Sequence, residues 1–191
     1  AFSMKGVTLP DNYSQVAANV LAQKYLRKAG IPKKLRNVKE KAVPSWLQKS
    51  VPDLKSMENL PENEKFGEEI DGKQTFRRLA GTWTYWGWKH GYFASEDDAR
   101  SYFDEMSYML ASQMVSPNSP QWFNTGLNWA YGIEGPAQGH HFVNPKTGDL
   151  ERSVNAYEHP QPHACFIQSV SDDLVSEGGI MNLWTREARL F

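Results

Sequence analysis

The stretch that decides the fold is HACFIQSVSDDL, residues 163–174. Its first half places the only cysteine of the chain, Cys165, next to Phe166 and Ile167, a composition typical of a buried strand. Its second half becomes polar and ends in two consecutive aspartates, which favour a turn or the start of a helix. The sequence therefore predicts a buried strand that carries Cys165 and ends in an acidic turn.

The segment that follows this turn, residues 179–191, has helical periodicity. Its apolar side chains share one face: Ile180, Leu183, Trp184, Ala188 and Phe191. No residue that usually ends a helix follows them. We therefore expect a helix that is interrupted by the end of the chain, and hence a piece of something longer.

Three segments further upstream predict helices with an apolar face. The first runs from Asn12 to Gly30, and the second covers about residues 74–90. The third begins at Ser95, which together with Asp98 resembles a capping box. The apolar stripes of the three are Val16, Val20, Leu21 and Leu26; Phe76, Leu79, Ala80, Trp83 and Trp86; and Tyr102, Phe103, Met106, Leu110 and Met114.

Residues 31–73 lack a sustained period and are interrupted by prolines, so we expect a strap that wraps the body of the domain. Trp46 and Leu47 would pin it. A positive cluster surrounds Glu40 and consists of Lys33, Lys34, Arg36, Lys39 and Lys41. One interpretation of this cluster is a solvated face, and the other is a contact with nucleotide phosphates or with another subunit.

Two further loops are indicated by turn residues. The stretch NPKTGD, residues 144–149, predicts a turn between short strands at 141–143 and 150–152. Asn118, Ser119 and Pro120 predict a loop.

Composition excludes several classes of protein. The 191 residues carry a net charge of −1, which argues against a general affinity for nucleic acid or for an acidic membrane. One cysteine cannot form an internal disulfide, which fits a reducing compartment. No apolar run approaches the roughly 20 residues of a membrane span. A cytoplasmic protein is the expectation.

A second motif, SPNSPQWFNTG at residues 116–126, lies upstream of Cys165. Together with HACFIQSVSDDL and with YEHPQP at 157–162, it resembles the opening of the catalytic chain of ribonucleotide reductases. The residues of these three motifs are most similar to those of the class II, adenosylcobalamin-dependent members. The resemblance covers about residues 12–191, which is nearly the whole chain.

The resemblance implies a fold and a domain organisation. A mostly helical N-terminal domain would span residues 1–130, with the strap at 31–73. Residues 131–162 would form an inserted β-hairpin and a linker. Residues 163–191 would supply the first strand and helix of a ten-stranded α/β barrel, which is truncated here.

Cys165 would be catalytic by this resemblance, as one member of a redox-active pair whose partner lies later in the barrel. From the residues alone, a single cysteine is a small apolar side chain. Reduction of a substrate by two electrons oxidises a dithiol, and this chain has no second thiol. The thiyl-radical cysteine of the family and its catalytic Asn and Glu cannot be assigned here either. We therefore expect the 191-residue chain to be inactive alone.

The resemblance also assigns binding residues. The substrate would contact Ser119, Gln121 and Ala164, although Gln121 stands where many family members have Thr. A dNTP effector would contact Asp172, Asp173, Leu174 and Arg186. From the residues alone, the two aspartates favour an N-terminal helix cap, and the resemblance reverses that ranking for Asp172. The spacing of His159, His163 and Cys165 lacks a fourth ligand for zinc, so we assign no metal site.

The resulting hypothesis is an N-terminal part of an enzyme that converts ribonucleotides to 2′-deoxyribonucleotides by thiyl-radical chemistry. Its cofactor would be adenosylcobalamin, held by the complete enzyme. Its partners would be a ribonucleotide, a dNTP effector, the remainder of the reductase and a second copy in a homodimer. Two alternatives are a non-catalytic nucleotide-binding or scaffold module and one half of a split reductase.

Overall fold

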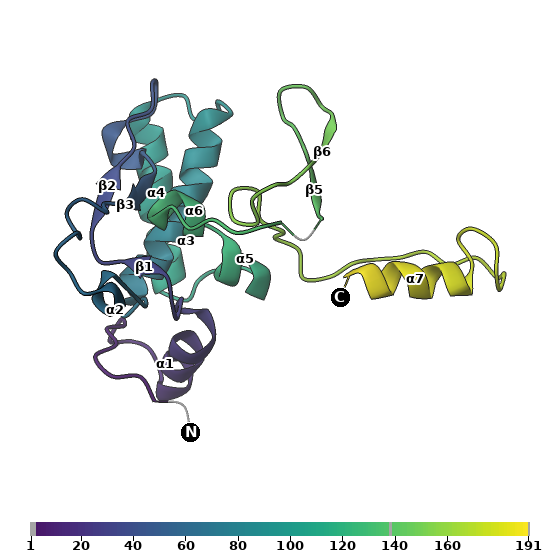
Figure 1. Ribbon diagram of the computed structural model, residues 1–191, viewed down its shortest axis with the longest axis horizontal. Coiled ribbons are helices and arrows are strands. Elements are labelled where there is room, and N and C mark those ends of the chain that lie inside the picture. The colour runs from purple at the N-terminus through teal and green to yellow at the C-terminus, as the bar shows by residue number, and fades with distance from the viewer. Residues whose placement is uncertain (1–2, 138, 191) are drawn as a thin grey trace.

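The computed structural model describes residues 3–137 and 139–190. Figure 1 shows a helical body, a β-hairpin that projects from it, and a C-terminal helix that lies apart from both. No helix within the described ranges is long and apolar enough to cross a membrane.

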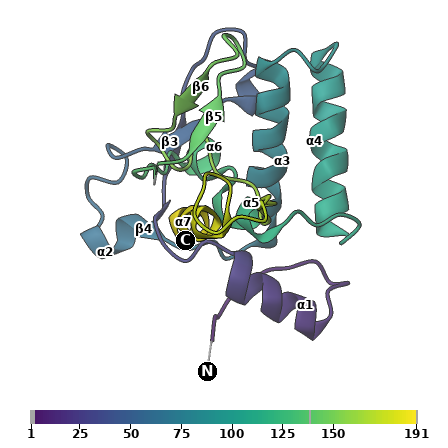
Figure 2. The same ribbon diagram turned by 90° about the vertical axis from the view of Figure 1, so that its right-hand side faces the viewer.

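Two long helices, α3 (Gly72–Lys89) and α4 (Glu96–Ala111), run side by side in both views of the body (Figures 1 and 2). Asp71 caps α3 and forms a capping box with Gln74. Ser95 caps α4, because its hydroxyl accepts a hydrogen bond of 3.1 Å from the backbone N–H of Asp98. Both helices occupy the segments that the sequence predicts.

The first helix is shorter than expected. The segment α1 (Gln15–Val20) is capped by Ser14 and continues as a π-helix, η1 (Leu21–Tyr25). Beyond Tyr25 the backbone is bonded to side chains instead of to the next helical turn. The carbonyl of Tyr25 accepts from Arg78 at 3.2 Å, and the N–H of Arg27 donates to Glu69 at 2.8 Å. The helix therefore ends before Gly30, the expected terminus.

The strap contains only short elements, each too small to stand alone. Leu47 is fully buried, and its carbonyl accepts a 3.0 Å hydrogen bond from the indole of Trp129. Trp46 packs against the buried hydrophobic cluster that contains Leu47 and Trp129. The elements are β1 (Ile31–Pro32) antiparallel to β4 (Phe66–Gly67), β2 (Leu35–Asn37) antiparallel to β3 (Ser50–Pro52), the 3₁₀ turn η2 (Ser45–Leu47) and α2 (Glu62–Lys65).

The predicted loop at 118–120 is instead the start of a helix. Asn118 caps α5 (Ser119–Asn124), with a proline in its first turn. A short helix α6 (Leu127–Tyr131) follows after Gly126, whose φ is +85°. A Cβ at Gly126 would lie 2.2 Å from the carbonyl oxygen of Arg78, so the close approach of α5 and α3 requires glycine there.

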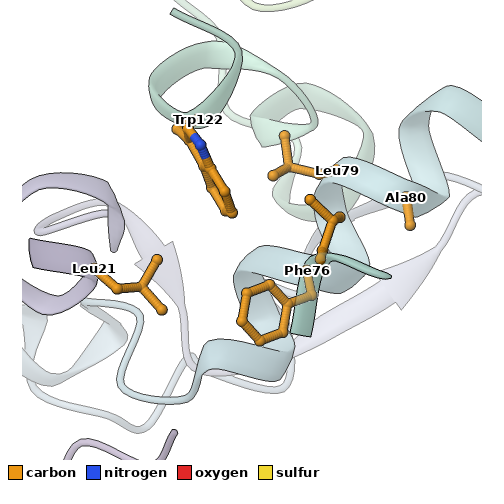
Figure 3. Packing of buried hydrophobic residues seen from close by; sticks show 6 residues of the cluster. Leu21, Phe76, Leu79, Ala80 and Trp122 are labelled. Carbon is orange, nitrogen blue, oxygen red and sulfur yellow. The ribbon is translucent and has the colours of Figure 1, made fainter. Parts of the chain in front are cut away.

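The main hydrophobic cluster lies where α3 meets η1, α4 and α5. Figure 3 shows the indole of Trp122 between the side chain of Leu21 and those of α3. Burial of these apolar side chains stabilises the body by roughly 1.5–3 kcal/mol for each large residue. The cluster consists of Leu21, Phe76, Leu79, Ala80, Leu110 and Trp122.

Beyond the body, the expected hairpin forms between β5 (His141–Val143) and β6 (Leu150–Arg152), with Val143 opposite Leu150. The chain then runs extended to a turn and to α7 (Ile180–Leu190), where a helix was expected. The predicted strand around Cys165 is not formed, because no other described strand lies beside it to complete the hydrogen-bond ladder. The barrel that the resemblance implies is not part of the described fold.

Candidate functional site

Cys165 lies on the extended segment and is exposed in this chain, whereas the buried position was expected for the complete enzyme. Its neighbours Phe166 and Ile167 are exposed as well, and Ile167 keeps essentially all of its surface accessible. A hollow of about 660 Å³ opens beside Cys165 and is also lined by Arg186 and Arg189 of α7. The thiol therefore faces an open groove with two positively charged side chains.

Arg186 holds α7 against this segment. Its guanidinium donates a 2.9 Å hydrogen bond to the carbonyl of Ser169. Its Nε is buried and has no hydrogen-bond partner among the residues that the structure describes. Arg186 was predicted to meet effector phosphates, and the structure places it next to Cys165.

The acidic turn folds back on itself. One carboxylate oxygen of Asp173 accepts hydrogen bonds from the backbone N–H groups of Val175 at 2.9 Å and Ser176 at 2.7 Å. The hydrogen bonds from Ser176, and then the one from Val175, lower the pKa of this carboxyl. Asp172 has no hydrogen-bond partner within the described part of the chain, and Leu174 is exposed. Asp173 thus stabilises the turn, whereas the carboxylate of Asp172 remains able to accept hydrogen bonds from a ligand.

The residues that were predicted to contact substrate lie in two places. Ala164 sits on the extended segment beside Cys165. Ser119 and Gln121 belong to α5 in the helical body, and their side chains make internal contacts. The hydroxyl of Ser119 lies 3.3 Å from that of Tyr25, and the amide oxygen of Gln121 accepts from Thr125 at 2.6 Å.

A buried ion pair between Arg78 of α3 and Glu69 of the strap was not predicted from the sequence. Arg78 and Glu69 are 1% and 0% exposed, and Nε of Arg78 lies 2.8 Å from Oε1 of Glu69. Arg78 also donates to the carbonyl of Thr125 at 2.9 Å and to that of Tyr25. Its guanidinium therefore joins the strap, the end of η1 and the end of α5.

The carboxylate of Glu69, like the guanidinium of Arg78, has several hydrogen-bond partners. Besides Arg78, its carboxylate accepts from the hydroxyls of Thr75 and Tyr131, both at 2.8 Å, and from the N–H of Arg27. Burial alone would raise the pKa of Glu69. The charge of Arg78 and these hydrogen bonds outweigh burial, so the pKa lies below its usual value. No local signal predicts this pair, because Glu69 lies in the irregular strap.

Known proteins are similar to this chain along its whole length. Residues 1–113 match the family model described as class II vitamin B12-dependent ribonucleotide reductase. The whole chain is 63% identical to the vitamin B12-dependent ribonucleotide reductase of Bradyrhizobium diazoefficiens and 64% identical to that of Agrobacterium fabrum. A more distant relative of the same name, from Rhodopirellula baltica, is 30% identical.

The chain therefore belongs to the class II ribonucleotide reductases and corresponds to their N-terminal region. It spans 15% of the length of each of these three relatives.

The candidate residues do not by themselves form a site for the cobalamin on which these relatives depend. Cys165, Asp172 and Asp173 lie on one exposed segment, and among the described residues the wall that faces Cys165 consists only of side chains of α7. A broad, flat corrin ring would need a more extensive wall.

Proposed function

We propose that the chain is the N-terminal part of an enzyme that reduces ribonucleotides to 2′-deoxyribonucleotides in the cytoplasm. The observation that carries the proposal is the match along the whole chain at 63–64% identity to reductases of two species. The complete enzyme would use adenosylcobalamin as its radical source. The part described here would contribute one redox thiol and portions of two nucleotide sites.

Cys165 is the redox thiol in this proposal. The 2′-hydroxyl of the substrate leaves as water, and two thiols supply two electrons and two protons as they join in a disulfide. The second thiol and the thiyl radical come from the rest of the enzyme, and an external dithiol reduces the disulfide again. The exposure of Cys165 and the open groove beside it support this role, because a thiol must be accessible to exchange.

Two nucleotide sites complete the proposal. Backbone N–H groups and short side chains of α5, including Ser119 and Gln121, would contact the substrate together with Ala164. The turn from Asp172 to Leu174 would hold a dNTP effector, with Arg186 near its phosphates. The exposed side chains of Ile180 and Trp184 on α7 support a helical interface with a second copy.

The proposed function predicts a sharp difference between two proteins. The full-length enzyme, supplied with adenosylcobalamin and a dithiol, is expected to form deoxynucleotides. The 191-residue chain under the same conditions is expected to form none, because it lacks the second thiol and the radical cysteine. Product is measured by chromatography of labelled nucleotides. An inactive full-length protein would refute the reductase assignment, and an active short chain would refute the division of roles.

A second prediction concerns the effector. Asp172→Ala in the full-length enzyme is expected to weaken dNTP binding by about 10- to 100-fold, the value of a charge-assisted hydrogen bond. Isothermal titration calorimetry with each dNTP measures the change. Asp104→Ala, which removes an exposed carboxylate from α4, is the matched control and should bind as the wild type does. If both variants keep full affinity, Asp172 does not contact the effector.

A further inference from the structure

All five histidines of the chain line a single hollow. This hollow has a volume of about 800 Å³ and lies between the end of α3 and the hairpin. Its remaining walls include three aromatic side chains, Trp86, Tyr92 and Phe142. The histidines come from three parts of the sequence: His90, His140 with His141, and His159 with His163. The fold brings these three parts together.

The hollow has a flat, ordered wall. The ring of His159 stacks on that of Phe142 with 3.8 Å between centroids and 7° between planes. One ring nitrogen of His140 lies 2.6 Å from the carbonyl oxygen of His159 and fixes the hairpin to this segment. Burial lowers the pKa of His159, which favours its uncharged ring. Such a surface suits a flat aromatic ligand.

A second hollow of about 410 Å³ adjoins the first, and Trp86, His90, Glu158 and His159 line both. Its character is different, because three lysines surround it: Lys49, Lys89 and Lys146. Two acidic side chains, Glu40 and Glu158, face them. We call the two adjoining hollows the histidine–lysine cleft.

The lysines of the cleft are only partly neutralised. Glu40 is bonded to Lys89 and accepts a 2.6 Å hydrogen bond from Tyr85. The Nζ atom of Lys49, in contrast, lies 3.7 Å from Glu158 and 3.4 Å from the amide oxygen of Asn128, both long contacts. Lys146, on the hairpin turn, has no acidic partner in the described ranges. Two ammonium groups therefore remain able to bind an anion.

We propose that the histidine–lysine cleft binds a small anion that joins a flat aromatic ring to a phosphate group, of the size of a mononucleotide. The ring would lie against His159, Phe142 and Trp86, and the phosphate would meet Lys49 and Lys146. A metal ion fits less well, because no three His, Cys, Asp or Glu side chains in the described structure converge to hold one.

The proposal goes beyond the proposed function and does not rest on it. The cleft contains neither Cys165 nor the acidic turn, and it meets the groove beside Cys165 only at His163. A ligand here would be distinct from the substrate and the effector. Because the cleft lies between the hairpin and α3, its ligand would also fix the position of the hairpin against the body.

The histidines themselves provide the test. Because every histidine of the 191-residue chain lines the cleft, each imidazole signal in an NMR spectrum of this chain reports on it. The probes are adenosine monophosphate, adenosine and inorganic phosphate. Adenosine monophosphate is expected to shift the signals of His159 and His140. It should also bind at least about tenfold more tightly than adenosine or inorganic phosphate alone, because it contacts both ends of the cleft.

Matched variants separate this site from general attraction between charges. Lys49→Gln and Lys146→Gln are each expected to weaken binding of adenosine monophosphate by about tenfold, the value of one charge-assisted hydrogen bond. Lys73→Gln removes the same charge from an exposed position in the first turn of α3 and should leave the affinity unchanged. The imidazole signals of the unliganded variants show whether the cleft is intact. Absence of shifts, equal binding of phosphate alone, or equal loss in all three variants would overturn the proposal.

Discussion

Arg78→Met is expected to lower the free energy of unfolding by about 3–5 kcal/mol, the usual cost of leaving one partner of a buried ion pair alone. The substitution keeps an apolar chain of similar length but leaves the carboxylate of Glu69 buried without its cation. It also removes the donors to the carbonyls of Tyr25 and Thr125. The strap, η1 and α5 would lose their common contact.

Urea denaturation followed by tryptophan fluorescence measures this change. Arg77→Met is the matched control, because Arg77 is the adjacent residue of α3 and is exposed; it should change stability by less than about 0.5 kcal/mol. A double variant with Glu69→Gln is expected to regain part of the loss, since the buried negative charge is then absent. Equal stability of the two single variants would mean that the pair contributes nothing net.

The same pair predicts a dependence on pH. The pKa of Glu69 is lower in the folded protein than in the unfolded chain. Its contribution to stability is therefore fully present above the unfolded pKa and is lost as the pH falls through the folded pKa. In Arg78→Met the charge that lowers this pKa is gone and burial raises it, so protonation of Glu69 should relieve part of the loss. The difference in unfolding free energy between wild type and Arg78→Met is therefore expected to shrink as the pH falls, which urea denaturation at a series of pH values measures.

The parts of the fold that the sequence predicts are those with local signals. The capping residue Ser95 lies beside the helix it begins, the apolar stripe that predicts α3 lies within that helix, and the turn residues at 144–149 lie between the strands they join. Such signals act over a few residues and need no tertiary context. The helix α7 has a sufficiently regular apolar stripe to be predicted in the same way.

The features that could not be predicted depend on contacts between distant residues. Glu69 and Arg78 meet because the strap folds over α3, and the bonds that this pair makes to the backbone of Tyr25 and Arg27 lie where the first helix ends. The strand around Cys165 fails for a related reason. Its composition fits a strand, but a strand forms only when a neighbour supplies the second half of the ladder.

The candidate site likewise has features that the local sequence predicts and features that depend on contacts between distant residues. The motif around Cys165 identifies the family from residue identities alone, and the comparisons confirm that assignment. The approach of Arg186 to the Cys165 segment requires the turn at 171–179, whose geometry depends on the hydrogen bonds of Asp173. The histidine–lysine cleft could not be predicted, since its histidines come from three parts of the chain that only the fold brings together.

Cys165→Ser in the full-length enzyme is expected to abolish multiple turnover, the largest effect on activity that the proposed function predicts. Serine cannot form the disulfide that stores the two oxidising equivalents after the substrate is reduced, so the dithiol cycle stops. The change should leave the fold intact. Cys165 is exposed in this chain, and a surface substitution of this size alters stability by about 0.5 kcal/mol or less.

Steady-state formation of deoxynucleotides with excess dithiol measures the effect, and thermal denaturation confirms that the variant is folded. Ser169→Ala is the control, because it makes a small side-chain change on the same extended segment and leaves the carbonyl that Arg186 binds in place. Its turnover should match that of the wild type. If the folded Cys165→Ser enzyme turns over at the rate of this control, Cys165 has no part in the reduction. The open groove beside Cys165 would then be explained by the contact between the extended segment and α7.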